Sequence, residues 1–329
     1  MAADFPVFDL AAFEGGDDAA RRALGAQVDR ICRETGFLAV AGHGVPATVI
    51  EAAWNKARAF FDLPLEAKLA AQVPHPGYPY GYLPPQAEAL AKSREVDTPP
   101  DLKESFNGGP LAVPPGLYDP EALGFCYAPT PWPHQPPGFV EAWKAYYRAM
   151  EDLAARVMAV FAVALELDAD FFAPLIDRPI SALRALNYPE PERPPLPGQL
   201  RAGAHSDYGS LTILLPEAAA GGLEILAPDG GWRPVPTVPG AFVINIGDLM
   251  ARWTNDRWVS TLHRVVNPPP DATGSLRRQS LAFFHQPNWD AEIACLPNCL
   301  APGEAARYDP VRSGPYLMAK FQATVKPAA

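Results

Sequence analysis

The chain has 329 residues, of which 48% are hydrophobic, and its formal net charge is −10 at pH 7. This composition can form a sizeable core, and the acidic balance argues against nucleic acid or an anionic membrane as a partner. Neither a signal peptide nor an apolar run of the roughly 20 residues that span a bilayer is found. Four cysteines in so long a chain make no disulfide framework, so we expect reduced thiols in a cytoplasmic protein.

The N-terminal region predicts short strands and two helices. Phe5–Leu10 alternates as an edge strand does, and Phe37–Val40 is a short apolar strand. Asp17–Glu34 is expected to be helical, because Asp17 suits the start of a helix and a glycine follows its end. A second, core-facing helix follows Pro46, with apolar residues at Ile50, Trp54, Ala57 and Phe61.

The next part of the chain predicts a long irregular segment and a long helix. Residues 72–137 are rich in Pro, Gly and aromatic residues, as loops that cover or line a binding site often are. Within them, Tyr80 and Phe106 are candidates to line a substrate entrance, although packing explains them equally well. Glu141–Leu167 keeps one apolar face at helical spacing, so we expect a long helix packed against a sheet.

The pattern then changes to short apolar strands separated by Gly- and Pro-rich turns. A run of strands after helices predicts an α+β fold whose core is an antiparallel barrel or jelly roll. A C-terminal helix is expected over Gly314–Thr324. The expected strands are Leu183–Tyr188, Leu211–Leu215, Leu223–Leu226, Phe242–Ile246, Leu262–Val266 and Ser280–Phe284.

The sequence RAGAHSDYGSLTILL holds a candidate metal site. His205 and Asp207 are separated by one residue, and on an extended strand such residues point to the same face. His263, on a later predicted strand, is a candidate third ligand. Two His and one carboxylate on one face of an octahedron suit non-haem Fe(II), and a zinc ion with a bound water is the alternative.

A second anchor is expected at Arg278 and Ser280. The same period of two places this guanidinium and this hydroxyl on one strand face, where a guanidinium can grip a carboxylate with two hydrogen bonds. The parity continues to Phe284, which is then a wall of the substrate pocket, whereas Phe283 and His285 face away.

Several motifs together resemble the isopenicillin N synthase-like family of Fe(II)/2-oxoglutarate-dependent oxygenases. They are FPVFDL, ETGFLAVAGHGVP, FFDLPLEAK, DLKESFNGG, HSDYGSLTILL, NIGDLMARWTNDRWVSTLHRVVNP and RQS, and they span nearly the whole chain. The resemblance implies one oxygenase domain over 1–329, with a double-stranded β-helix (jelly roll) core at 181–290, helices flanking it in 1–180 and a C-terminal segment at 291–329.

The resemblance also implies the chemistry. In this family the Arg-x-Ser pair grips the distal carboxylate of 2-oxoglutarate, and Tyr188 matches a tyrosine that adds a contact. Fe(II) and O2 would then oxidise a small organic substrate, with release of succinate and CO2. Three alternatives are an iron oxidase of the same fold that does not use 2-oxoglutarate, an ethylene-forming type of enzyme, and a non-catalytic jelly roll that binds a ligand.

Overall fold

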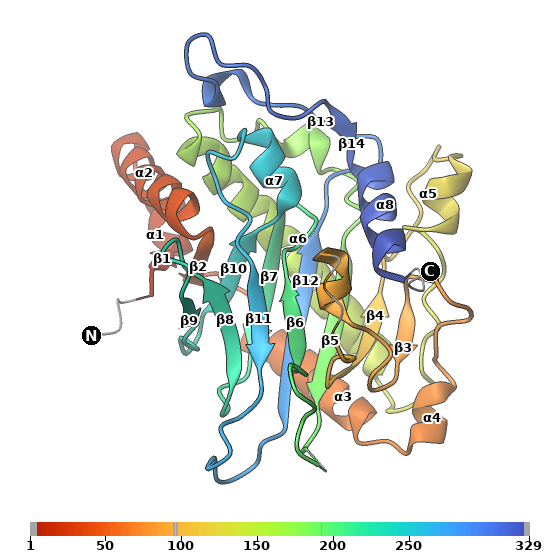
Figure 1. Ribbon diagram of the computed structural model, residues 1–329. Helices are drawn as coiled ribbons and strands as arrows, with labels where there is room; N and C mark the ends of the chain where they lie inside the picture. Colours follow the sequence, from red (N-terminus) through yellow and green to blue (C-terminus); the bar gives the residue numbers. More distant parts are fainter. Residues whose placement is uncertain (1–4, 95, 97, 192, 326–329) are drawn as a thin grey trace.

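Two facing β-sheets form the centre of the computed structural model, which describes residues 5–94, 96, 98–191 and 193–325 (Figure 1). The large sheet holds β1 (Val7–Asp9), β2 (Phe37–Ala41), β3 (Gly81–Leu83), β4 (Glu104–Gly108), β5 (Ala182–Tyr188), β7 (Leu211–Pro216), β10 (Phe242–Ile246) and β12 (Arg278–His285). The small sheet holds β6 (Ala202–His205), β8 (Gly222–Leu226), β9 (Trp232–Pro234) and β11 (His263–Val266). A further pair is formed by β13 (Glu292–Ile293) and β14 (Val311–Arg312).

The strand order departs from the chain order, as in a jelly roll. In the large sheet it is β1-β2-β10-β7-β12-β5-β4-β3, and in the small sheet β6-β11-β8-β9. Neighbouring strands run antiparallel apart from β1 and β2. The central strand β12 pairs with β5 on one side and β7 on the other, so its side chains reach the middle of both sheet faces.

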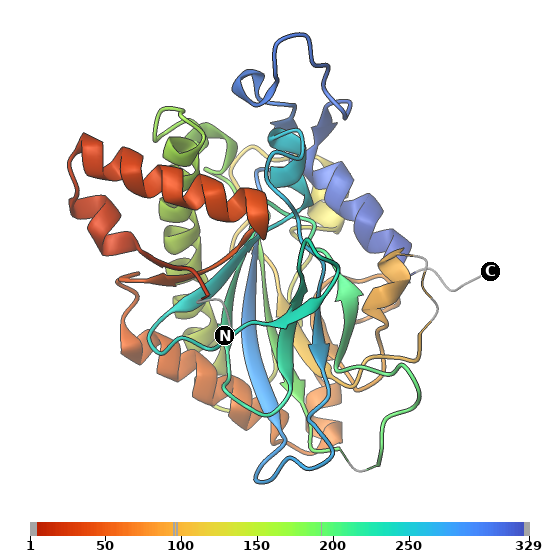
Figure 2. The same ribbon diagram turned by 60° about the vertical axis from the view of Figure 1, so that its left-hand side comes forward.

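The helices α2 (Asp18–Glu34), α3 (Ala47–Phe61) and α6 (Phe139–Ala164) cover the outer face of the large sheet (Figure 2). The α-helices are α1 (Leu10–Gly15), α2 (Asp18–Glu34), α3 (Ala47–Phe61), α4 (Leu65–Leu69), α5 (Pro120–Gly124), α6 (Phe139–Ala164), α7 (Asp248–Trp253) and α8 (Ser313–Val325). Single 3-10 turns lie at η1 (Leu90–Arg94), η2 (Ala173–Leu175) and η3 (Pro297–Cys299). Of the described helices, none combines the length and the apolar character needed to cross a bilayer.

Local chemistry fixes the ends of α2. Asp17 accepts a hydrogen bond from the Ala20 backbone N–H at 2.8 Å, which satisfies a donor of the first turn. Gly36 has a φ of +64°, and a Cβ there would lie 2.3 Å from the Val259 carbonyl oxygen. Glycine is therefore required where the chain leaves α2 and enters β2.

Segment 72–137 corrects one expectation, because it supplies strands β3 and β4 as well as loops. Within β4, Phe106 points to the helical face, so its prediction as a residue of the substrate entrance was wrong. Its ring is fully buried and lies 5.4, 5.2 and 5.1 Å from the rings of Phe60, Phe139 and Trp143. The next residue, Asn107, faces the space between the sheets instead.

Another buried group, His285 at the end of β12, should make the protein sensitive to acid. Burial lowers the pKa of His285 to about 3, and its ring lies 2.7 Å from the Ser210 hydroxyl. Since the ordinary pKa is 6.5, the neutral imidazole contributes stability that is complete above pH 6.5 and is lost as the pH falls toward 3.

We expect His285→Gln to remove this dependence. Between pH 7 and pH 5 the parent should lose about 2 kcal/mol of unfolding free energy through this histidine, and the variant should not. Urea unfolding of both proteins at the two pH values measures the difference. If both proteins lost the same unfolding free energy between the two pH values, His285 would not be the source of the acid sensitivity.

Candidate active site

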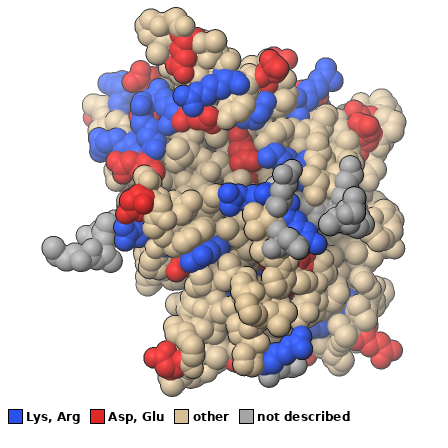
Figure 3. Space-filling model, in the orientation of Figure 1, with Lys and Arg blue, Asp and Glu red and all other residues tan. Residues whose placement is uncertain are grey.

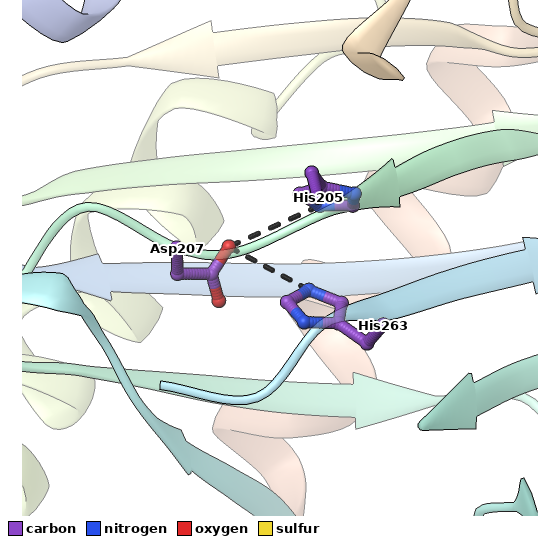
Figure 4. Close-up of side chains that lie close together, drawn as sticks. All are labelled: His205, Asp207 and His263. Atoms are coloured by element: carbon purple, nitrogen blue, oxygen red, sulfur yellow. Dashed lines mark ion pairs between the residues drawn. The ribbon is translucent and has the colours of Figure 1, made fainter. Parts of the chain in front are cut away.

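The three predicted metal-binding side chains meet between the two sheets (Figure 4). His205 ends β6, Asp207 follows it in the connecting loop, and His263 begins β11. Because β11 pairs with β6, His263 lies directly opposite His205. One ligand atom from each residue lies within 4.8 Å of the other two. The group is thus compact enough for one ion to contact all three.

Hydrogen bonds orient both imidazoles. The Nδ1 atom of His205 lies 2.7 Å from the Gly203 carbonyl oxygen, and that of His263 lies 3.1 Å from the Thr261 carbonyl oxygen. A carbonyl only accepts, so Nδ1 carries the proton and donates in each ring. The lone pair on each Nε2 is therefore left for a metal, as in metal sites whose histidines are held by a second group.

The carboxylate of Asp207 is held in the same way. Its Oδ2 accepts from the Thr212 hydroxyl at 2.6 Å and from the Asn245 amide at 2.7 Å. Its Oδ1 lies 3.7 Å from His263 Nε2 and 4.0 Å from His205 Nε2. One oxygen is thus fixed by protein donors while the other is directed to the histidines. The sequence analysis named neither Asn245 nor Thr212 as a site residue, and each lies within an expected apolar strand.

A cavity of about 220 Å³ joins this group to the remaining candidates. Period-two alternation brings Arg278, Ser280, Ala282 and Phe284 of β12 to the cavity wall, and Tyr188 of β5 as well. Tyr80 also lines it, and its hydroxyl donates to the Cys126 carbonyl oxygen at 2.7 Å. Of the candidates named from the sequence, only Phe106 lies elsewhere.

Arg278 lies in the cavity wall in an unusual state for an arginine. Its side chain is buried, and no acidic side chain among the described residues forms an ion pair with it. The guanidinium carbon lies 5.3 Å from the centre of the Tyr188 ring, and that of Arg201 lies 5.9 Å from the same ring. Burial lowers the pKa of Arg201, and neighbouring Arg278 lowers it further. Arg201 is attracted by Glu190, whereas Arg278 has no acidic partner among the described residues, so an anionic ligand is favoured at Arg278.

The pair Phe283 and Phe284 shows how strictly the two faces of β12 differ. Phe284 lines the cavity and is only partly buried by protein, whereas Phe283 packs on α6, with its ring 5.2 Å from that of Tyr147. We therefore expect Phe284→Ala to lower substrate-dependent kcat/KM by about tenfold or more, because a wall that positions the substrate is lost. Iron content and unfolding free energy should change little.

Phe283→Ala is the matched control, since it removes the same ring one residue away. Loss of a buried phenylalanine costs about 3–5 kcal/mol of stability. Turnover with a range of small substrates, together with urea unfolding, distinguishes the two variants. A stability loss in Phe284→Ala as large as that in Phe283→Ala would contradict this register.

Comparisons with known proteins agree with this geometry. Residues 5–135 match the family model described as "non-haem dioxygenase in morphine synthesis N-terminal", and residues 180–287 match that of the "2OG-Fe(II) oxygenase superfamily". The "2-oxoglutarate-Fe(II) type oxidoreductase hxnY" of Emericella nidulans is 36% identical, over 93% of this chain and 86% of that protein. Validamycin A dioxygenase of Streptomyces hygroscopicus subsp. limoneus is 31% identical, over 97% of this chain and 86% of that protein.

Solved structures give the same result. A full-length Neurospora crassa protein, crystallised in complex with alpha-KG, that is 2-oxoglutarate, has a TM-score of 0.84 and 32% identity, and the match covers 97% of this chain and 96% of that one. The same protein with alpha-KG and thymine gives a TM-score of 0.83 and 31% identity, covering 97% of each chain. These relatives select iron over zinc, and 2-oxoglutarate dependence over the alternatives without it. The chain belongs to the 2OG-Fe(II) oxygenase superfamily and is a non-haem Fe(II) dioxygenase with a jelly-roll core that uses 2-oxoglutarate and O2.

Proposed function

We propose that His205, Asp207 and His263 hold the Fe(II), and that Arg278, Ser280 and Tyr188 bind the distal carboxylate of 2-oxoglutarate. One observation carries this assignment. A single cavity contains both an oriented His2Asp group and a buried guanidinium that has no acidic partner in the described chain. The first fits an iron ion and the second fits a carboxylate.

Each side chain then has a task. The two Nε2 atoms and Asp207 Oδ1 set the ligand positions, while Thr212 and Asn245 keep the carboxylate from rotating. The Arg278 guanidinium pairs with the distal carboxylate of 2-oxoglutarate, and the apolar walls around Phe284 exclude water. When bound, Fe(II) supplies the activation of O2 that is coupled to oxidative decarboxylation of 2-oxoglutarate to succinate and CO2.

We propose a small organic molecule as the substrate that is oxidised. The Neurospora crassa relative was crystallised with thymine, and other relatives are named for small molecules such as validamycin A. A screen of small organic compounds that follows succinate formation and O2 uptake tests this. Succinate that forms only with Fe(II), 2-oxoglutarate and one of the compounds present is the expected result. No succinate under any condition, with iron bound, would contradict the proposal.

Two broader proposals concern the whole chain. We propose one oxygenase domain over 1–329, with the regions 1–180, 181–290 and 291–329, because one hydrophobic core joins side chains of α2, α3 and α6 to those of the large sheet. We also propose a cytoplasmic location, since all four cysteines are free thiols.

The charged side chains are mixed on the face of the molecule that Figure 3 shows. Lys and Arg side chains are interleaved with Asp and Glu along the upper part of this face, and much of the lower part is uncharged.

A further inference from the structure

A second polar group lines the cavity on β5 and β4, strands on the other side of β12 from β7. Arg184 projects from β5 on the same face as Tyr188. Its two terminal nitrogens donate to the two Glu88 carboxylate oxygens at 3.1 and 3.2 Å, and its Nε donates to the Asn107 side-chain oxygen at 2.6 Å. These three bonds hold the guanidinium in one orientation and leave two of its five N–H groups for another acceptor.

The charge of Arg184 is already balanced. Lys103 Nζ lies 3.3 Å from Glu88 and 2.6 Å from Asp101, so two cations and two carboxylates form one cluster. Burial alone would raise the pKa of Glu88, but Arg184 and Lys103 together hold it at about 2. Glu88 is therefore ionised throughout the neutral range. Arg184 can offer hydrogen bonds to a ligand, but the cluster as a whole offers no net positive charge.

Gln286, two residues beyond Phe284, adds an acceptor to the same cavity. The residue is 4% exposed, and its buried Oε1 atom has no hydrogen-bond partner in the described structure. A buried amide oxygen without a hydrogen-bond partner is unfavourable, because it has lost its hydrogen bonds to water. If the amide turns its oxygen toward the cavity that Gln286 lines, a donor carried by a bound molecule can supply the missing hydrogen bond.

We propose that the primary substrate is an uncharged molecule with a carboxamide or lactam-like pattern, whose acceptor faces Arg184 and whose N–H or O–H faces Gln286. This inference rests on the proposed function, since Arg278 is reserved there for 2-oxoglutarate. Arg184 and Arg278 are the arginines among the described residues of the cavity wall, and no lysine is among them. A substrate carboxylate would thus be buried without a free cation, which is unfavourable.

Matched probes test the charge preference in the intact protein. Anaerobic protein with Fe(II) and 2-oxoglutarate is titrated with benzamide, 2-pyridone, benzoate and toluene. Binding is measured by saturation-transfer NMR or by a change in the visible absorption band of the complex with Fe(II) and 2-oxoglutarate. At least one amide should bind ten- to a hundredfold more tightly than benzoate and toluene. Failure of both amides to bind, or benzoate binding as tightly as they do, overturns the proposal.

Variants of Glu88 and Gln286 sharpen the test. Glu88→Gln leaves Arg184 with an uncompensated charge, so the preference should shift toward benzoate by at least tenfold. Glu88→Asp keeps the charge and should retain the parent preference. Gln286→Leu should weaken the amides and leave toluene unchanged. If Glu88→Gln keeps the parent preference, the electrostatic argument is wrong.

The absorption band of the Fe(II) and 2-oxoglutarate complex separates two kinds of failure. If the parent protein forms no such band on addition of 2-oxoglutarate, the proposed function itself fails. If the band forms in the parent and in every variant while the probes bind in another order, only the substrate inference fails. None of these substitutions replaces His205, Asp207, His263 or Arg278, to which the proposed function assigns the binding of Fe(II) and 2-oxoglutarate.

Discussion

Replacing Asp207 with Ala is expected to remove iron binding and turnover together. Asp207 is the one anionic side chain of the group, and its Oδ1 faces both imidazoles. Removal of groups that only hold a metal ligand typically costs 10- to 100-fold in metal affinity or activity. Loss of the ligand itself should therefore lower iron affinity by more than about 100-fold, and succinate formation should fall below detection.

Asn245→Leu provides a graded comparison. It leaves Asp207 and the Thr212 donor in place and removes only one of the two donors to Oδ2, so the affinity for iron should fall within the 10- to 100-fold range. Iron per chain after anaerobic dialysis, with circular dichroism to confirm folding, measures both variants. Asp207→Ala protein that folds and retains iron as the parent does would show that the ion binds elsewhere.

Replacing Arg278 with Ala should weaken the binding of 2-oxoglutarate by about 30-fold or more while Fe(II) stays bound. The guanidinium is buried and lacks an acidic partner among the described residues, so a dianion supplies its natural partner. Losing one member of such a buried pair costs about 2–5 kcal/mol. At 1.4 kcal/mol per factor of ten, the dissociation constant should rise roughly 30-fold to several thousand-fold.

Arg277→Ala is the natural control, one residue away on the opposite strand face. Arg277 donates to the Asn187 side chain at 2.8 Å and pairs with Asp62, away from the cavity. Its loss should leave 2-oxoglutarate binding unchanged. Titration of 2-oxoglutarate into anaerobic Fe(II) protein, monitored by the charge-transfer absorption, gives the dissociation constants of both variants. No binding by the parent, with O2 still consumed with some substrate, would favour an oxidase.

Strand periodicity made much of the site predictable. From Arg278 alone, the alternation placed Ser280 and Phe284 on the cavity face and Phe283 on the other, and the structure has this arrangement. The same rule applied from Tyr188 leads to Arg184, four residues earlier on β5, so this residue could have been found. It was missed because a lone arginine in an apolar strand resembles an ordinary surface residue.

Other residues could not be placed from the sequence. Phe106 was wrongly placed at the substrate entrance because β4 is a short strand of mixed polarity, ESFNG, inside a Pro-rich segment, so no alternation indicated a strand or its register. The partners Glu88 and Asn245 lie 96 and 38 residues from the groups they hold. Such pairings arise from tertiary folding, and no local pattern encodes them.

The alternation along β12 also separates two kinds of mutational effect. Even-numbered positions from 278 to 284 face the cavity, and Leu281 and Phe283 belong to the hydrophobic core. In a scan of all substitutions, changes at the cavity-facing positions would therefore alter mainly the catalytic activity. Changes at the neighbouring core positions would alter mainly the abundance of the protein in the cell. Selection on such a strand can change what the enzyme accepts at one set of positions while the other set preserves its folding.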